Sequence, residues 1–222
     1  FRIGSVSKVF ATLAALQLCD QGVLSLATTV HACLPEFSLR PRATYPPSSA
    51  ITLRQLLGYH SGIPGDLFRF GDLTVPFGDF SSIALNYLPS TYLLYPTDHV
   101  NSYCNTAFTL AEMIVGRMNT SGVSYVSYCD HRIFRPLGMD STSFFCDKPV
   151  ISNHLAVSYL AGEPLPPEYV NAHGSGGMYS TPRDLAQFLM AILAGGEGPE
   201  GRLISADALN AMLTPQGTNL PL

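Results

Sequence analysis

The stretch that decides the fold is residues 1–19, FRIGSVSKVFATLAALQLC, in which Ser5 and Lys8 stand three positions apart. Residues with this spacing lie on one face of a helix in adjacent turns, so a helix here would place a hydroxyl beside an amine. Lys148 is the other lysine of the sequence, and no serine stands three residues before it. A serine beside an amine at a helix N-terminus is an arrangement that can activate a nucleophile.

The segment at 6–19 is apolar on nearly every side, which predicts a buried helix that ends at Asp20-Gln21-Gly22. An ammonium inside a protein is costly unless it is paired or gives up its proton. The alternative interpretation is an N-cap serine with a lysine that extends to solvent. The buried helix and the scarcity of lysine favour the catalytic interpretation of the pair.

Further segments follow in a characteristic order: ITLRQLL at 51–57, SGIP at 61–64, YCN at 103–105, FRPLGM at 134–139, and GGMYST at 176–181 with DLA at 184–186. Together with residues 1–8 they resemble the serine beta-lactamase and penicillin-binding protein superfamily, the class C beta-lactamase-related hydrolases in particular. In that superfamily the serine is acylated and the lysine assists. The resemblance spans nearly all of the chain.

The resemblance implies an α+β fold, of which this chain would be mainly the helical lobe of a beta-lactamase/transpeptidase-like fold. Most of the antiparallel sheet is expected outside the chain. We therefore expect residues 1–222 to form one beta-lactamase-related domain truncated at both ends. The third motif of the family, Lys-Thr-Gly or His-x-Gly, would follow the last helices, and we assign it to no segment of this sequence. Its absence supports the expectation of a truncated domain. The missing strands are also expected to cover one side of the apolar helix at 6–19.

The resemblance also assigns roles to four residues. Ser5 would be the nucleophile, with its backbone N–H as one oxyanion donor, and Lys8 and Tyr103 would take its proton. Asn105 would bind the substrate amide and the lysine. A second Y-x-N occurs at Tyr169, but it follows a proline-rich loop, and packing is the preferred interpretation there.

Two residues near these motifs depart from the pattern of the family. Cys104 stands where a serine is common, and Tyr59 stands where a histidine is usual when the chains are aligned on Ser61 and Gly62. Neither departure removes a catalytic group. Substrate choice is expected to reside in the long connection between Pro64 and Pro96, where this family varies most.

Composition argues against several other function classes. A net charge of −4 without a basic run gives no reason to expect nucleic acid or an anionic membrane surface, and no apolar stretch is long enough to span a bilayer. Five cysteines without C-x-x-C and six scattered histidines indicate no zinc site or disulfide framework, so we expect no metal or cofactor. An extracytoplasmic location is suggested by the resemblance alone, and the sequence does not indicate an oligomeric state.

Three hypotheses about function remain open. The first is a serine hydrolase that forms an acyl-enzyme with a small-molecule or peptide ester, amide or beta-lactam, as beta-lactamases, esterases and D-amino-acid peptidases do. The second is a non-catalytic relative that binds peptide or penicillin, or an inactive fragment that lacks the third motif and serves only as a scaffold. The third, ranked far behind, is a Ser-His-Asp hydrolase that uses Ser175 beside His173, because the surrounding G-x-S-x-G pattern is absent.

Local signals predict five further helices. Thr52 and Gln55 form a capping box for a helix that ends at Leu57, and Thr181 caps another helix with Pro182 at its first position. The remaining helices are expected at 106–118, at 124–133, and at 206–213 after Ser205.

Overall fold

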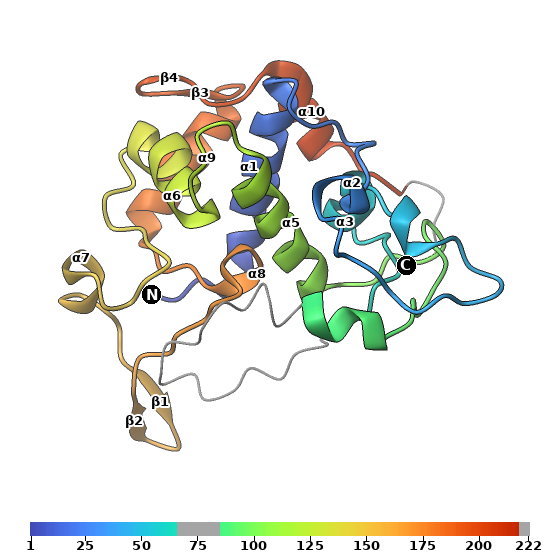
Figure 1. Cartoon of the computed structure of the whole chain (residues 1–222). Helices are drawn as coiled ribbons and strands as arrows, with labels where there is room; N and C mark the ends of the chain where they lie inside the picture. The colour runs from blue at the N-terminus through green and yellow to red at the C-terminus, as the bar shows by residue number, and fades with distance from the viewer. Residues whose placement is uncertain (66–84, 218–222) are drawn as a thin grey trace.

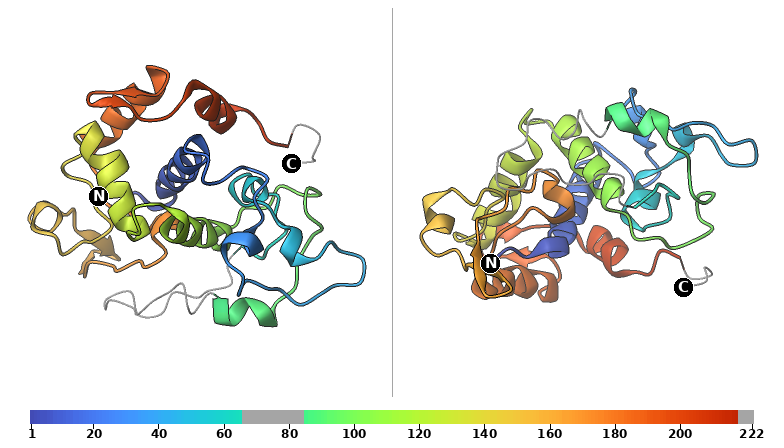
Figure 2. Two further views of the ribbon diagram at one scale, coloured as in Figure 1. Left: turned by 45° about the horizontal axis from the view of Figure 1, so that its top comes forward. Right: turned by 90° about the horizontal axis from the view of Figure 1, so that it is seen from below.

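A computed structural model describes residues 1–65 and 85–217, in which helices gather around α1 (Ser7–Asp20). α1 lies in the middle of the molecule, with α5 (Asn105–Met118) and α10 (Ala206–Leu213) beside it (Figure 1). Both views in Figure 2 keep α1 between these two helices. The helix that carries Lys8 is therefore the central element of the fold.

α1 is buried, as its apolar sequence predicts. It follows a 3-10 turn, η1 (Gly4–Val6), and Phe10, Leu13 and Leu18 are fully buried within it. The strands expected to cover one side of α1 would lie outside this chain, so that expectation stays a prediction. Among the described elements, α1 packs against α5, α10, α6 (Tyr125–Cys129) and α8 (His173–Gly176).

Most of the helices predicted from local signals are present. α3 (Leu53–Leu57) has the predicted capping box, in which Thr52 accepts from the Gln55 N–H and the Gln55 side chain accepts from the Thr52 N–H. Thr181 caps α9 (Pro182–Leu193), and Ser205 caps α10. These ends agree with the sequence because a cap is a local interaction that needs no distant partner.

The helix expected at 124–133 is not one regular helix. α6 continues into a π-helical turn, η4 (Asp130–Phe134), and then into a 3-10 turn, η5 (Arg135–Leu137). Pro136 has no N–H to donate to a helical ladder, and Gly138 ends the segment with a φ of 64°. The irregular turns thus lie directly before and around Pro136, where a regular α-helix is disfavoured.

Short elements complete the described fold. Two small antiparallel sheets pair β1 (Ser158–Leu160) with β2 (Glu163–Leu165) and β3 (Glu197–Gly198) with β4 (Gly201–Arg202). The mixed, mainly helical fold class is thus confirmed. The other short elements, which the sequence did not predict, are α2 (Val30–Cys33), η2 (Ser48–Ala50), η3 (Leu88–Ser90), α7 (Pro149–Ser152) and α8.

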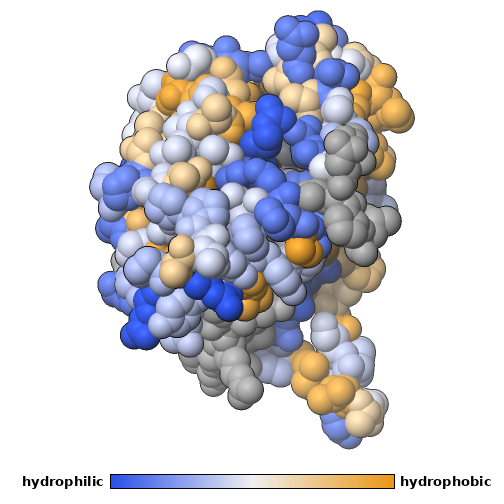
Figure 3. Space-filling model, turned by 90° about the vertical axis from the view of Figure 1, so that its right-hand side faces the viewer, coloured by the Kyte–Doolittle hydropathy of each residue, from blue (hydrophilic) through white to orange (hydrophobic). Residues whose placement is uncertain are grey.

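The β1–β2 hairpin projects from the body of the molecule (Figure 1), and hydrophobic residues cover part of the projection at the foot of Figure 3. Tyr159 pairs with Pro164 in the register of this hairpin, and Tyr159 and Leu160 are 65% and 68% exposed.

Within the described ranges, no helix is both long and apolar enough to cross a bilayer.

The core around α1 is rich in aromatic side chains. The ring of Phe10 lies 4.6 Å from that of Phe188 and 5.9 Å from that of Phe134, measured between centroids. These contacts connect α1 to α9 and to η4, which are distant in the sequence. A second, smaller cluster comprises Cys146, Ile151 and Tyr179, with Tyr169 packed against it.

We predict that Phe10→Ala lowers the free energy of unfolding of the full-length protein by about 3–5 kcal/mol, because it leaves a cavity between three helical segments. Phe10→Leu keeps most of the volume and should cost less than about 1.5 kcal/mol. Chemical denaturation measures both. Equal losses for the two variants would contradict the placement of Phe10 at the centre of the core.

Candidate active site

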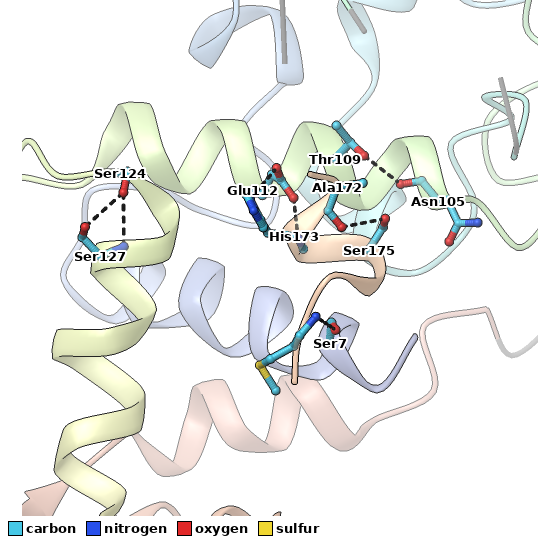
Figure 4. Close-up of polar contacts among 11 residues, drawn as sticks. Ser7, Asn105, Thr109, Glu112, Ser124, Ser127, Ala172, His173 and Ser175 are labelled. Atoms are coloured by element: carbon cyan, nitrogen blue, oxygen red, sulfur yellow. Dashed lines mark hydrogen bonds and ion pairs between the residues drawn. The ribbon is translucent and has the colours of Figure 1, made fainter. Parts of the chain in front are cut away.

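Ser5 lies at the exposed start of α1, in the turn η1. Gly4 before it has a φ of +53°, a left-handed conformation that glycine adopts without strain. Ser7 ties this turn to a distant segment, because its hydroxyl donates to the Gly4 carbonyl at 2.7 Å and accepts from the Met178 N–H at 3.1 Å (Figure 4). The backbone that presents Ser5 is therefore fixed from both sides.

The side chain of Lys8 is 96% removed from solvent, since 4% of the residue is exposed, and its Nζ contacts three oxygens. Nζ lies 3.2 Å from Ser5 Oγ, 2.7 Å from Asn105 Oδ1 and 2.5 Å from the carbonyl oxygen of Ser175. The three partners come from η1, α5 and α8. One amine thus joins three segments of the chain.

Two of these partners are carbonyl oxygens, which only accept hydrogen bonds. Asn105 Oδ1 and the Ser175 carbonyl therefore take two N–H donors of Lys8, and the third position of Nζ points to Ser5 Oγ. In the ammonium this position donates a hydrogen bond to Oγ. In the neutral amine it is a lone pair that can accept the proton of the serine. The same geometry suits both steps of a proton transfer.

Tyr103 lies on the other side of the serine hydroxyl. Its hydroxyl is hydrogen-bonded to Ser5 Oγ at 2.5 Å, and Lys8 Nζ lies 4.7 Å from the centroid of its ring. Tyr103 is 49% exposed, whereas Tyr169 packs against the separate Cys146 cluster. The structure thus brings together Ser5, Lys8 and Tyr103, and Tyr169 is a packing residue.

The motif that contains Tyr103 and Asn105 is held by the turn at 61–65. The Gly65 carbonyl accepts from the N–H groups of Asn105 and Thr106, at 3.0 and 3.2 Å. Cys104 Sγ accepts from the Ala107 N–H at 3.2 Å and so caps α5. A thiol in place of the usual serine keeps the capping acceptor at this position.

Sequence reasoning missed the group that supports the Ser175 carbonyl. Glu112, which is 5% exposed on α5, accepts a hydrogen bond from the Gly174 N–H, and its other oxygen lies 4.0 Å from His173 Nδ1 (Figure 4). A Cβ at Gly174 would lie 2.9 Å from the Phe108 carbonyl oxygen, so this close approach requires glycine. A glutamate amid apolar helix residues was the signal that could have revealed the contact.

The side chains of the 173–175 segment are not arranged as a catalytic pair. The hydroxyl of Ser175 is buried and donates to the Ala172 carbonyl at 3.1 Å. Burial lowers the pKa of His173 from its ordinary 6.5 to about 4, because the imidazolium loses its hydration. This effect outweighs the nearby Glu112 carboxylate, so the imidazole is neutral near pH 7.

Two further expectations concern ligands and substrate choice. No three histidine, cysteine, aspartate or glutamate side chains come together as metal ligands in the part of the chain that the structure describes. Most of the connection between Pro64 and Pro96, where substrate choice is expected, lies outside the described residues.

Comparison with known proteins places the chain in a family. Residues 1–221 match the family described as Beta-lactamase. The chain belongs to the beta-lactamase family. It is 28% identical to Beta-lactamase-like protein 2 of Dictyostelium discoideum over 220 residues, which cover 96% of this chain and 39% of that protein. It is also 28% identical to Penicillin-binding protein 4 of Amycolatopsis lactamdurans, with 97% of this chain and 56% of that protein covered.

Solved structures of this beta-lactamase fold agree. A class C beta-lactamase from Rhodobacter sphaeroides is 27% identical with a TM-score of 0.70, and 94% of this chain and 55% of that one are covered. A D-stereospecific amidohydrolase from Streptomyces sp. is 25% identical with a TM-score of 0.76, and 96% and 65% are covered. The chain spans about half the length of the curated relatives it matches.

We predict that His173 makes the protein less stable as the pH falls from 6.5 to 4. Its pKa in the folded protein is about 4 and its ordinary value is 6.5. Between these values the unfolded chain binds a proton that the folded protein does not, so stability falls as pH falls. The difference between the two pKa values corresponds to a loss of about 3 kcal/mol in the free energy of unfolding once the pH is below both values.

The His173→Gln variant cannot take up this proton, and its free energy of unfolding should fall less steeply over the same range. Urea denaturation at several pH values measures the slope. The same substitution at the exposed His131 shows what the loss of any histidine does. A wild-type slope in His173→Gln would contradict the burial of a neutral imidazole.

Proposed function

We propose that this member of the beta-lactamase family is a serine hydrolase that forms an acyl-enzyme at Ser5. The observation that carries the proposal is the position of Ser5 Oγ, which accepts hydrogen bonds from Lys8 Nζ at 3.2 Å and from the Tyr103 hydroxyl at 2.5 Å. The neutral amine of Lys8 and the phenolate of Tyr103 are the forms that would take the proton of the serine. A nucleophile in hydrogen-bond contact with a base, which is itself oriented by a third group, is the signature of covalent catalysis. Here Asn105 and the Ser175 carbonyl orient Lys8.

In the proposed reaction, Ser5 Oγ attacks the carbonyl carbon of an ester, amide or beta-lactam while Tyr103 and Lys8 take its proton. The bond from that carbon to the leaving oxygen or nitrogen breaks, and the leaving group receives the proton. Water then attacks the acyl-enzyme and restores Ser5. The Ser5 N–H, in the first helical turn, would donate to the developing oxyanion, and Asn105 would bind the amide of the substrate.

The substrate classes are suggested by the relatives. These include a class C beta-lactamase, a D-stereospecific amidohydrolase and a penicillin-binding protein. All three names refer to acyl compounds with an amide or lactam carbonyl or to their binding. A penicillin-binding relative that forms the adduct without rapid release is the second candidate, and the lifetime of the adduct distinguishes the two.

We predict that Ser5→Ala abolishes covalent labelling of the full-length protein by a fluorescent penicillin and by a fluorophosphonate. Ser175→Ala is the matched control and should leave labelling intact, because its hydroxyl bonds within its own turn. Gel fluorescence and intact-protein mass spectrometry measure the adduct. Labelling that survives Ser5→Ala but not Ser175→Ala would move the nucleophile to α8.

We also predict that Tyr103→Phe lowers the acylation rate by about 10²-fold or more, the usual contribution of a general base. The ring and its packing remain, so the free energy of unfolding should change little. Stopped-flow measurement with a chromogenic lactam or ester reports the rate. An adduct that persists for hours in the wild-type protein would favour penicillin binding over hydrolysis.

A further inference from the structure

Tyr59 occupies an unfavourable backbone conformation close to the candidate site. Its φ is 62°, and the other non-glycine residues with left-handed φ in the described ranges are Asp98 and Ala161. A bulky side chain adopts this conformation only where the surrounding structure holds it, and such residues cluster at functional sites. The unfavourable backbone conformation of Tyr59 therefore directs attention to what its side chain and carbonyl contact.

The ring of Tyr59 packs on the rings around Lys8. It stacks on Tyr103 with centroids 5.1 Å apart and planes 30° apart, and it lies 5.4 Å from Phe108. Lys8 Nζ lies 4.7 Å from the Tyr103 ring and 5.6 Å from the Phe108 ring. The distance between Tyr59 and Tyr103 falls in the preferred range for aromatic pairs.

The backbone of Tyr59 contacts the same segment. Its carbonyl accepts from the N–H of Ser102, the residue before Tyr103, at 2.9 Å. The neighbouring His60 and Gly62 carbonyls accept from Asp98 and Leu94. The turn at 59–62 therefore runs beside the segment that delivers Tyr103, and Tyr59 contacts it through both its backbone and its ring.

We propose that Tyr59 is a positioning residue for Tyr103. Its carbonyl fixes the backbone before Tyr103, and its ring limits the rotation of a side chain that is 49% exposed. Together these contacts keep the Tyr103 hydroxyl on Ser5 Oγ. The inference rests on the proposed acyl-transfer function, since it assigns the orientation of the proposed base.

The ring of Tyr59, and not its hydroxyl, carries this role. Burial raises the pKa of Tyr59 well above its ordinary value, and the neighbouring Tyr103 raises it further. The phenol of Tyr59 therefore stays neutral and does not compete with Tyr103 as a base. Tyr59→Phe keeps the stacked ring and should leave the acylation rate within about twofold of wild type.

The test removes the ring without straining the backbone. Glycine adopts a φ of +62° freely, so Tyr59→Gly relieves the conformational cost as it deletes the stack. A displacement of about 1 Å in a reacting group can cost about 10²-fold. We expect Tyr59→Gly to slow acylation by a chromogenic lactam or ester by about 10- to 100-fold, mainly through kcat, in a protein that denaturation shows to be folded.

A double-mutant cycle separates positioning from a general structural effect. If Tyr59 acts through the hydroxyl of Tyr103, Tyr59→Gly should cost less than about twofold in a Tyr103→Phe background. An equal loss in both backgrounds overturns the proposal, as does an acylation rate in Tyr59→Gly within about twofold of wild type.

The same measurements distinguish failure of this inference from failure of the proposed function. If Tyr103→Phe slows acylation and Tyr59→Gly does not, only the positioning role is overturned. If Ser5→Ala and Tyr103→Phe both leave acylation intact, the proposed function is wrong and the positioning role with it.

Discussion

The candidate site depends on one buried amine and the oxygens that surround it. Lys8 Nζ sits within 3.2 Å of Ser5 Oγ, Asn105 Oδ1 and the Ser175 carbonyl, which come from three separate segments. A buried ammonium without such partners would be strongly destabilising. The fold must therefore bring η1, α5 and α8 to one point, and Glu112 holds α8 there through the Gly174 N–H.

A second constraint joins two motifs that are separate in the sequence. Carbonyls of the turn at 59–65 accept from backbone N–H groups at 94, 98, 102, 105 and 106. Gly62 is needed there, because its φ is +70° and a Cβ would lie 2.0 Å from the Tyr95 carbonyl oxygen. The turn that contains SGIP at 61–64 thus holds the backbone of the YCN motif at 103–105 in place. The two motifs act as one unit.

The parts of the site that could be predicted are the local ones. Ser5 and Lys8 are three residues apart, so helical geometry alone brings them together, and the capping box at Thr52 needs only its own turn. Tyr103 and Asn105 stand 98 and 97 residues from their partners, and only the family resemblance identified them. Periodicity carries no information about such distant contacts.

What the sequence could not reveal is where two backbones approach each other. The HGSG segment at 173–176 offers a serine beside a histidine, yet Gly174 serves packing, since a Cβ there would lie 2.9 Å from the Glu112 Cβ and from the Phe108 carbonyl oxygen. This approach sets the distance at which the Ser175 carbonyl meets Lys8. A serine flanked by glycines can thus contribute its carbonyl to a site while its hydroxyl is turned away, and only the tertiary structure distinguishes the two cases.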